Sequence, residues 1–174
     1  PFFASGFNLD PRDIDVHHEV LKIATTYYNR GGDSATNKEI KQIDGPSDVE
    51  KFVTTLFVWW HDVMNPKLAM KAIAAAVEAD LNPFGIAMAD TVLGLTQRSN
   101  KPPSAKELKV LMELFKSTGA IEQAINIGRA ALKAKPDDSV LERELNELAA
   151  ERALSEGGYE DIGEEEGGYR KFVK

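Results

Sequence analysis

The feature that most constrains the fold is an internal similarity at two offsets. An offset of 55 residues aligns apolar with apolar and alanine with alanine: Val53 with Leu108, Leu56 with Leu111, Trp60 with Phe115, Ala69 with Ala124, and Ala76 with Ala131. An offset of 33 residues aligns Val20 with Val53, Ile23 with Leu56, and Tyr27 with Trp60. The repeating unit is therefore about 34 residues, a length typical of helical repeats. Such units must stack, because one alone cannot bury its apolar face.

Helical periodicity runs along most of the chain, and no segment reads as a strand. We expect helices near 12–30, 48–60, 66–80, 84–97, 105–117, 120–135 and 139–154, and a short helical turn near 37–43. Ser47 and Glu50 have the spacing of a capping box. Pro66 suits a first helical position. The sequence therefore predicts an all-α fold.

Segment 105–138 carries the most specific pattern. The pattern is made by Leu108, Leu111, Phe115, Gly119, Ala124, Ala131, Leu132 and Pro136. At these spacings the segment resembles the tetratricopeptide repeat (TPR) family. It departs from the family at Met112, where a small residue is usual, and at Gly128, where a large one is usual. The resemblance implies a right-handed superhelix of antiparallel helical hairpins, a TPR-like α-solenoid.

The domain is expected to span residues 1–154. Its units lie near 17–50, 50–83 and 105–138, with an incomplete unit at 84–104 and a capping helix at 139–154. We expect small or helix-ending residues to allow the helices of the repeats to pack closely. These residues are Ala69, Ala76, Gly119, Ala124, Ala131 and Pro136. Residues 155–174 are expected to be an acidic, glycine-rich tail, extended or mobile, from which Tyr159, Ile162, Tyr169 and Phe172 could dock. Residues 7–11 look like the tail of a preceding repeat, so we expect a longer protein.

Composition excludes several classes of protein. The net charge is −7, and 12 acidic residues against two arginines fall in 137–166, while residues 1–136 are balanced. The sequence has no stripe of basic residues of the kind that binds nucleic acid. No uncharged apolar run approaches the roughly 18 residues of a membrane span. There is no cysteine, which leaves the compartment open, with the cytoplasm slightly preferred.

The TPR resemblance implies that the first helices of successive units line a concave groove. The groove candidates by position are His18, Lys22, Tyr28, Lys51, Thr54, Thr55, Trp59, Lys106, Lys109, Glu113 and Lys116. Trp59 is the expected anchor because Trp60 occupies the core stripe, unless helix 84–97 covers it. Five lysines in this set hint at an acidic partner. We expect a non-enzymatic scaffold that binds a protein or peptide without a cofactor.

An alternative is an enzyme or metal-binding domain using His17, His18 and His61. Neighbouring helical residues point about 100° apart, so His17 and His18 are poorly placed to share one ion, and no metal is expected. His61 is expected near a helix end. The glycine-rich segment 31–47 lacks the spacing of a phosphate-binding loop. We interpret it as a solvated insertion, although irregular segments often carry binding residues.

Overall fold

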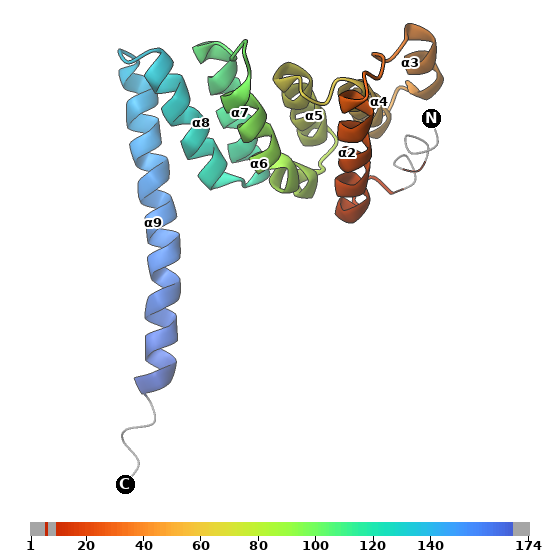
Figure 1. Ribbon diagram of the computed structural model, residues 1–174. Coiled ribbons are helices and arrows are strands. Elements are labelled where there is room, and N and C mark those ends of the chain that lie inside the picture. The colour runs from red at the N-terminus through yellow and green to blue at the C-terminus, as the bar shows by residue number, and fades with distance from the viewer. Residues whose placement is uncertain (1–5, 7–9, 169–174) are drawn as a thin grey trace.

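The computed structural model describes residue 6 and residues 10–168, with side chains as far as Ser155. Within that range the chain forms helices and no strand, so the predicted all-α class is confirmed (Figure 1). The helices are α2 (Ile14–Asn29), α3 (Asn37–Ile43), α4 (Asp48–His61), α5 (Pro66–Glu78), α6 (Asn82–Arg98), α7 (Ala105–Thr118), α8 (Ile121–Ala134) and α9 (Ser139–Gly168).

Local signals in the sequence fix several of these boundaries. The predicted capping box at Ser47 is confirmed: its side chain accepts a hydrogen bond from the Glu50 backbone N–H, and Glu50 reaches back to the Ser47 backbone. Ser104 begins α7 in the same way. Gly119 ends α7 with φ 90°, a left-handed conformation that glycine adopts without steric cost.

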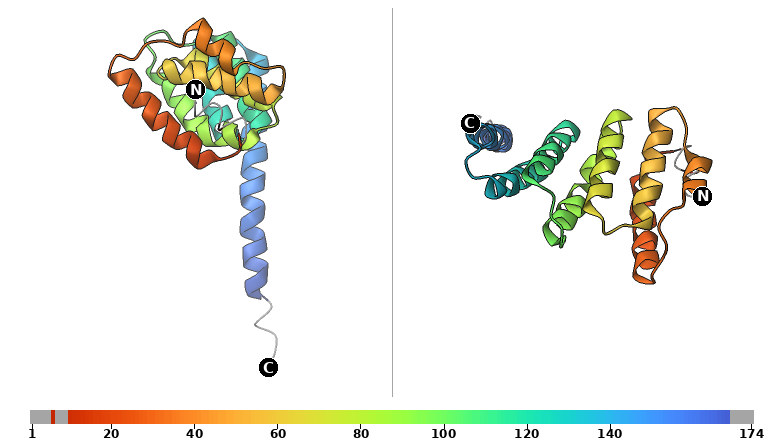
Figure 2. Two further views of the ribbon diagram at one scale, coloured as in Figure 1. Left: turned by 90° about the vertical axis from the view of Figure 1, so that its right-hand side faces the viewer. Right: turned by 90° about the horizontal axis from the view of Figure 1, so that it is seen from above.

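Consecutive helices from α4 to α9 pack against one another, and a second set of contacts joins α5 to α7 and α6 to α8. The result is a row of helices with α2 and α3 at one end and α9 at the other (Figures 1 and 2). The alanines predicted to lie at close helix contacts, Ala69, Ala76, Ala124 and Ala131, are all completely buried. Small side chains let helix backbones approach closely, which agrees with this packing.

Helix α2 lies along α4 in the same direction. Near its start, the His17 ring lies 6.0 Å from Phe52, and near its end the Tyr27 ring lies 5.6 Å from His61. The internal alignment matched Ile23 and Tyr27 to core positions of the second unit, and this prediction is wrong: they are 52% and 41% exposed. Among the described residues, α2 packs on α4 and α6 through one face, which leaves its other face uncovered.

Helix α9 packs on α8 through Leu141, Leu145 and Leu148, as the predicted capping helix requires. The helix continues past Leu154 to Gly168, where an extended or mobile tail was expected. No proline interrupts residues 155–168, so nothing in that stretch forbids helical backbone. The helix projects beyond the rest of the row (Figure 2).

Two other predictions concern the chain ends. The proposed docking strip of Tyr159, Ile162, Tyr169 and Phe172 lies outside the described side chains. Residues 7–9 of the expected preceding-repeat tail also lie outside the described residues.

Candidate functional site

Several predicted groove residues meet where α7 faces the start of α9. A pocket of about 380 Å³ opens there, and we call it the α7–α9 pocket. It is lined by Ala105, Lys106, Lys109, Val110, Glu113, Ala131, Lys135, Asp138 and Leu141. Lys106, Lys109 and Glu113 were predicted from the sequence. The structure therefore brings together three of the four groove candidates of the third unit, and Lys116 lies outside the lining.

Local structure positions the two walls of this pocket. The capping box of Ser104 and Glu107 starts α7 just before its lining residues. Helix α8 ends at Ala134, and the turn that follows returns the chain toward α7. Asp138, just before α9, accepts a hydrogen bond from the Leu141 backbone N–H at 3.1 Å. That cap fixes the start of α9 at the pocket edge.

Ion pairs then tie α7 to α9. The Lys109 ammonium lies 3.1 Å from the Asp138 carboxylate. The pKa of Asp138 is lowered, first by the Leu141 backbone N–H and then by Lys109. Further along, Lys116 pairs with Glu144, which raises the pKa of Lys116. These contacts hold the width of the pocket before any ligand arrives.

The lining of the α7–α9 pocket includes an apolar part. Val110 is 51% exposed and projects from α7, while Ala131 and Leu141 form a buried base. Charged side chains of α7, of the end of α8 and of Asp138 line the same pocket. Such a site provides apolar contact and charge-assisted hydrogen bonds for a non-covalent ligand.

The other groove candidates are not brought to this pocket. Lys22 lines a separate hollow on α2 with Ile23 and Arg30, and Tyr28 lines a third pocket. His18 is half-buried on α2. Lys51, Thr54 and Thr55 lie on α4, where the two threonine hydroxyls donate to carbonyls of their own helix. A single groove joining all three units is therefore not formed by these residues.

Trp59 is not an exposed anchor, so that prediction is wrong. Its side chain is 1% exposed, and its indole N–H donates to the Val63 carbonyl at 3.1 Å. Helix α4 packs against α2, α3 and α5, so its buried surface is wider than one stripe. That width covers Trp59 as well as Trp60, which is in the core as predicted.

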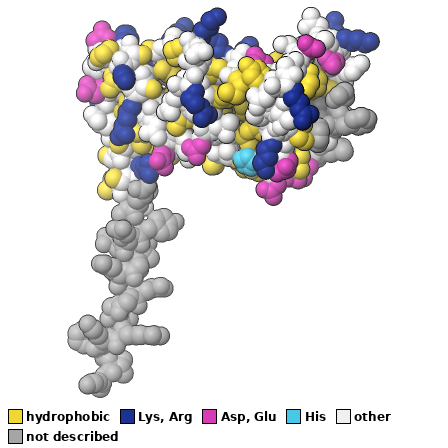
Figure 3. All heavy atoms as spheres, in the orientation of Figure 1, with side chains coloured by type: hydrophobic (Ala, Val, Ile, Leu, Met, Phe, Trp, Pro, Cys, Tyr) yellow, Lys and Arg dark blue, Asp and Glu magenta, His cyan; other side chains and the backbone are white. Residues whose placement is uncertain are grey.

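The five lysines do not make one basic groove. Lys22 pairs with Glu19, Lys51 with Asp48, Lys109 with Asp138, and Lys116 with Glu144. Lys106 alone of the five forms no ion pair within the described part of the chain. On the face shown in Figure 3, lysine and arginine side chains are scattered rather than gathered. Four of the five lysines that suggested an acidic partner are therefore already paired with acids of the chain itself.

The histidines occupy separate environments. His17 is buried, its Nε2–H donates to the Pro11 carbonyl at 2.8 Å, and its ring lies 4.8 Å from Phe84. Burial lowers its pKa. His61 ends α4, as predicted, and its Nδ1–H donates to the Phe57 carbonyl. Among the described residues, no three histidine, aspartate or glutamate side chains are close enough to share a metal ion.

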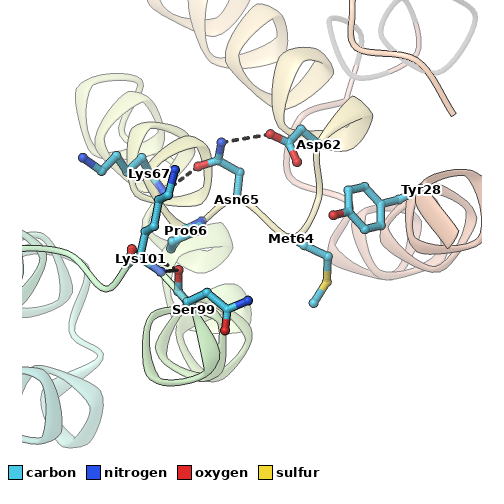
Figure 4. Close-up of a pocket in the computed structure, with 9 residues that line it drawn as sticks. Tyr28, Asp62, Met64, Asn65, Pro66, Lys67, Ser99 and Lys101 are labelled. Atoms are coloured by element: carbon cyan, nitrogen blue, oxygen red, sulfur yellow. Dashed lines mark hydrogen bonds between the residues drawn. The ribbon is translucent and has the colours of Figure 1, made fainter. Parts of the chain in front are cut away.

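A larger pocket, of about 530 Å³, lies between the end of α2, the α4–α5 turn and the α6–α7 loop (Figure 4). Tyr28 and Met64 project toward it from different elements. Some of its polar groups pair with each other: Asn65 donates to Asp62, and the Ser99 hydroxyl donates to the Lys101 carbonyl. Apart from Tyr28, sequence reasoning missed these residues, because most of them lie in turns or at the first positions of α5, where helical periodicity gives no signal.

Sequence reasoning also missed Val110, Lys135 and Asp138 as pocket residues. A signal existed for Val110: it is an apolar residue on α7 that lies outside the stripe of Leu108, Leu111 and Phe115. Lys135 and Asp138 reach the pocket only because the α8–α9 turn folds back, which spacing alone does not specify.

Comparison with known proteins finds no family model, no curated protein and no solved structure that matches this chain. None of the helices in the described residues combines the length and apolar character needed to cross a bilayer.

Proposed function

We propose that the chain is a non-enzymatic scaffold that binds a peptide or protein segment in the α7–α9 pocket. The observation that carries this proposal is the half-exposed Val110 side chain, which lines a pocket between α7 and the start of α9 together with charged side chains. An apolar side chain ringed by polar groups is the usual anatomy of a protein–protein contact.

We also infer a TPR-like, right-handed solenoid. In support, the segment with the family's spacings coincides with the helix pair α7 and α8, and contacts of α5 with α7 and of α6 with α8 are those of stacked hairpins. In a solenoid of this kind, the α7–α9 pocket lies between the first helix of one unit and the helix that follows the unit.

The ion pairs give this pocket a binding advantage. Ordering flexible side chains and loops on association costs free energy, and a surface that is already ordered avoids much of that cost. In the free protein, the buried leucines of α9 already pack on α8, and the Lys109–Asp138 and Lys116–Glu144 pairs link this region to α7. A ligand therefore meets a preformed site and makes stoichiometric, reversible contacts.

A random twelve-residue peptide library displayed on phage tests the proposal against the full chain. We expect enriched peptides whose binding falls by about tenfold or more in Val110→Asp, because a carboxylate replaces the apolar contact. Ile86→Asp on α6 is the matched control: Ile86 is 52% exposed, against 51% for Val110, and does not line the pocket.

Binding by Ile86→Asp should equal that of the unchanged chain. The proposal fails if no peptide is enriched, or if the enriched peptides bind Val110→Asp as well as the unchanged chain.

A further inference from the structure

Two lysines of α7, one of which lines the α7–α9 pocket, already bind carboxylates within the chain. Lys109 holds the Asp138 carboxylate and Lys116 holds the Glu144 carboxylate, both presented by the start of α9. Lys109 and Lys116 are seven residues apart, so they lie on one face of α7. One face of α7 is therefore a row of lysines that receives carboxylates from a neighbouring segment.

Two more lysines lie near this row. Lys106 lies one turn before Lys109 on the same side of α7 and lines the pocket, while Lys135 lines it from the end of α8. Neither lysine forms an ion pair among the described residues. The two acids of the lining form ion pairs with other lysines, Asp138 with Lys109 and Glu113 with Lys116, and Lys135 acts on Asp138 only through a longer-range charge interaction. Lys106 and Lys135 therefore give this side of the pocket an excess of positive charge.

We propose that the segment bound in the α7–α9 pocket is acidic and carries an aliphatic side chain. Its carboxylates pair with Lys106 and Lys135, and its aliphatic side chain rests on Val110. This inference rests on the proposed function and names the chemical class of its partner. The partner's carboxylates would therefore pair with lysines in the same way as Asp138 and Glu144 pair with Lys109 and Lys116 within the chain.

The same peptide library tests this inference through composition and through a lysine variant. Peptides enriched on the full chain should contain more aspartate and glutamate than the starting library. Synthesised individually, they should bind Lys106→Gln/Lys135→Gln about three- to tenfold more weakly, since each exposed ion pair contributes modestly. Affinity should also fall as salt rises from about 50 to 300 mM, because exposed charges are screened.

Two matched variants control for fold and for general charge. Lys133→Gln removes an exposed lysine of α8 that does not line the pocket, and it should bind as the unchanged chain does. Lys106→Arg/Lys135→Arg keeps both charges and should retain most of the affinity. Equal circular dichroism spectra of all variants would show that helicity is intact.

Each remaining result overturns the inference. Peptides that depend on Val110 but show no acidic excess and bind the glutamine variant normally would overturn it and leave the proposed function standing. A library with no enriched peptide would overturn both. Equal losses in Lys133→Gln and in the pocket variant would reduce the effect to net charge and would also overturn it.

Discussion

Met112 on α7 occupies the space opposite Gly128 on α8. A β-carbon at position 128 would lie 2.7 Å from Met112 Sδ and 2.3 Å from Leu145 Cδ2, both closer than real contacts allow. Position 112 has a large residue where the repeat pattern has a small one, and position 128 has the reverse. The two departures compensate each other at the meeting point of α7, α8 and α9.

Gly128→Ala should therefore destabilise the fold, although alanine favours a helix over glycine by about 1 kcal/mol. Overpacking of buried side chains costs typically about 1–3 kcal/mol, and Met112 and Leu145 are both buried. Urea unfolding measures the net change. A double-mutant cycle with Met112→Ala tests the contact. The double variant should lose less stability than the sum of the two single losses, by at least about 0.5 kcal/mol. A double variant whose stability loss equals the sum of the two single losses would show that positions 112 and 128 do not interact.

Trp59 and Trp60 should behave alike when replaced by alanine. Both side chains are buried, at 1% and 7% exposure, so each change leaves a large cavity that costs about 3–5 kcal/mol. Thermal or urea unfolding measures this loss. A Trp59→Ala protein with unchanged stability would contradict the buried position of its indole ring.

Protonation of His17 should weaken the fold as pH falls. Burial holds its pKa in the folded chain below the usual 6.5, so the unfolded chain binds more protons and stability decreases as pH drops below about 6.5. Asp10, Asp13 and His18 are the charged or titratable neighbours that act on it.

Urea midpoints measured between pH 7.5 and 5 provide the test. His17→Leu should lose part of this dependence, whereas His18→Gln should keep it. Parallel profiles for the unchanged chain and His17→Leu would show that His17 contributes nothing to the pH dependence.

Truncation should separate the two parts of α9. Deleting 155–174 should cost little stability, since Leu148 is the last buried apolar residue among the described side chains of α9, and Leu154 is 77% exposed. Deleting 139–174 should expose the apolar surface of α8 that Leu141, Leu145 and Leu148 cover. Light scattering and thermal unfolding compare the two deletions. Aggregation of the shorter deletion would place the end of α9 in the core.

The helices were predictable because their signals are local. Ser47 with Glu50, Pro66 and Gly119 mark boundaries through hydrogen bonds and backbone angles within a few residues. The core of α7 and α8 followed from helical spacing for the same reason. Where the chain runs as regular helix, periodicity names the buried face.

The site was less predictable because it depends on tertiary contacts. Spacing could not show that α4 is covered on several sides, which buries Trp59, or that α2 is covered on one side, which exposes Ile23. It also could not show that Lys109 and Lys116 would meet acids 29 and 28 residues later in the chain, one just before α9 and one within it. Three of the eleven groove candidates line the α7–α9 pocket: Lys106, Lys109 and Glu113.

The central claim is that a partner segment binds in the α7–α9 pocket, and methyl NMR tests it most directly. The full chain, labelled at valine, isoleucine and methionine methyl groups, is titrated with a synthetic peptide taken from the enriched library. The account predicts saturable shifts of the Val110 methyl signals, while those of Ile86 on α6 and Met64 at the α4–α5 turn stay in place. Shifts centred on Met64 or Ile86, with Val110 unchanged, would contradict it.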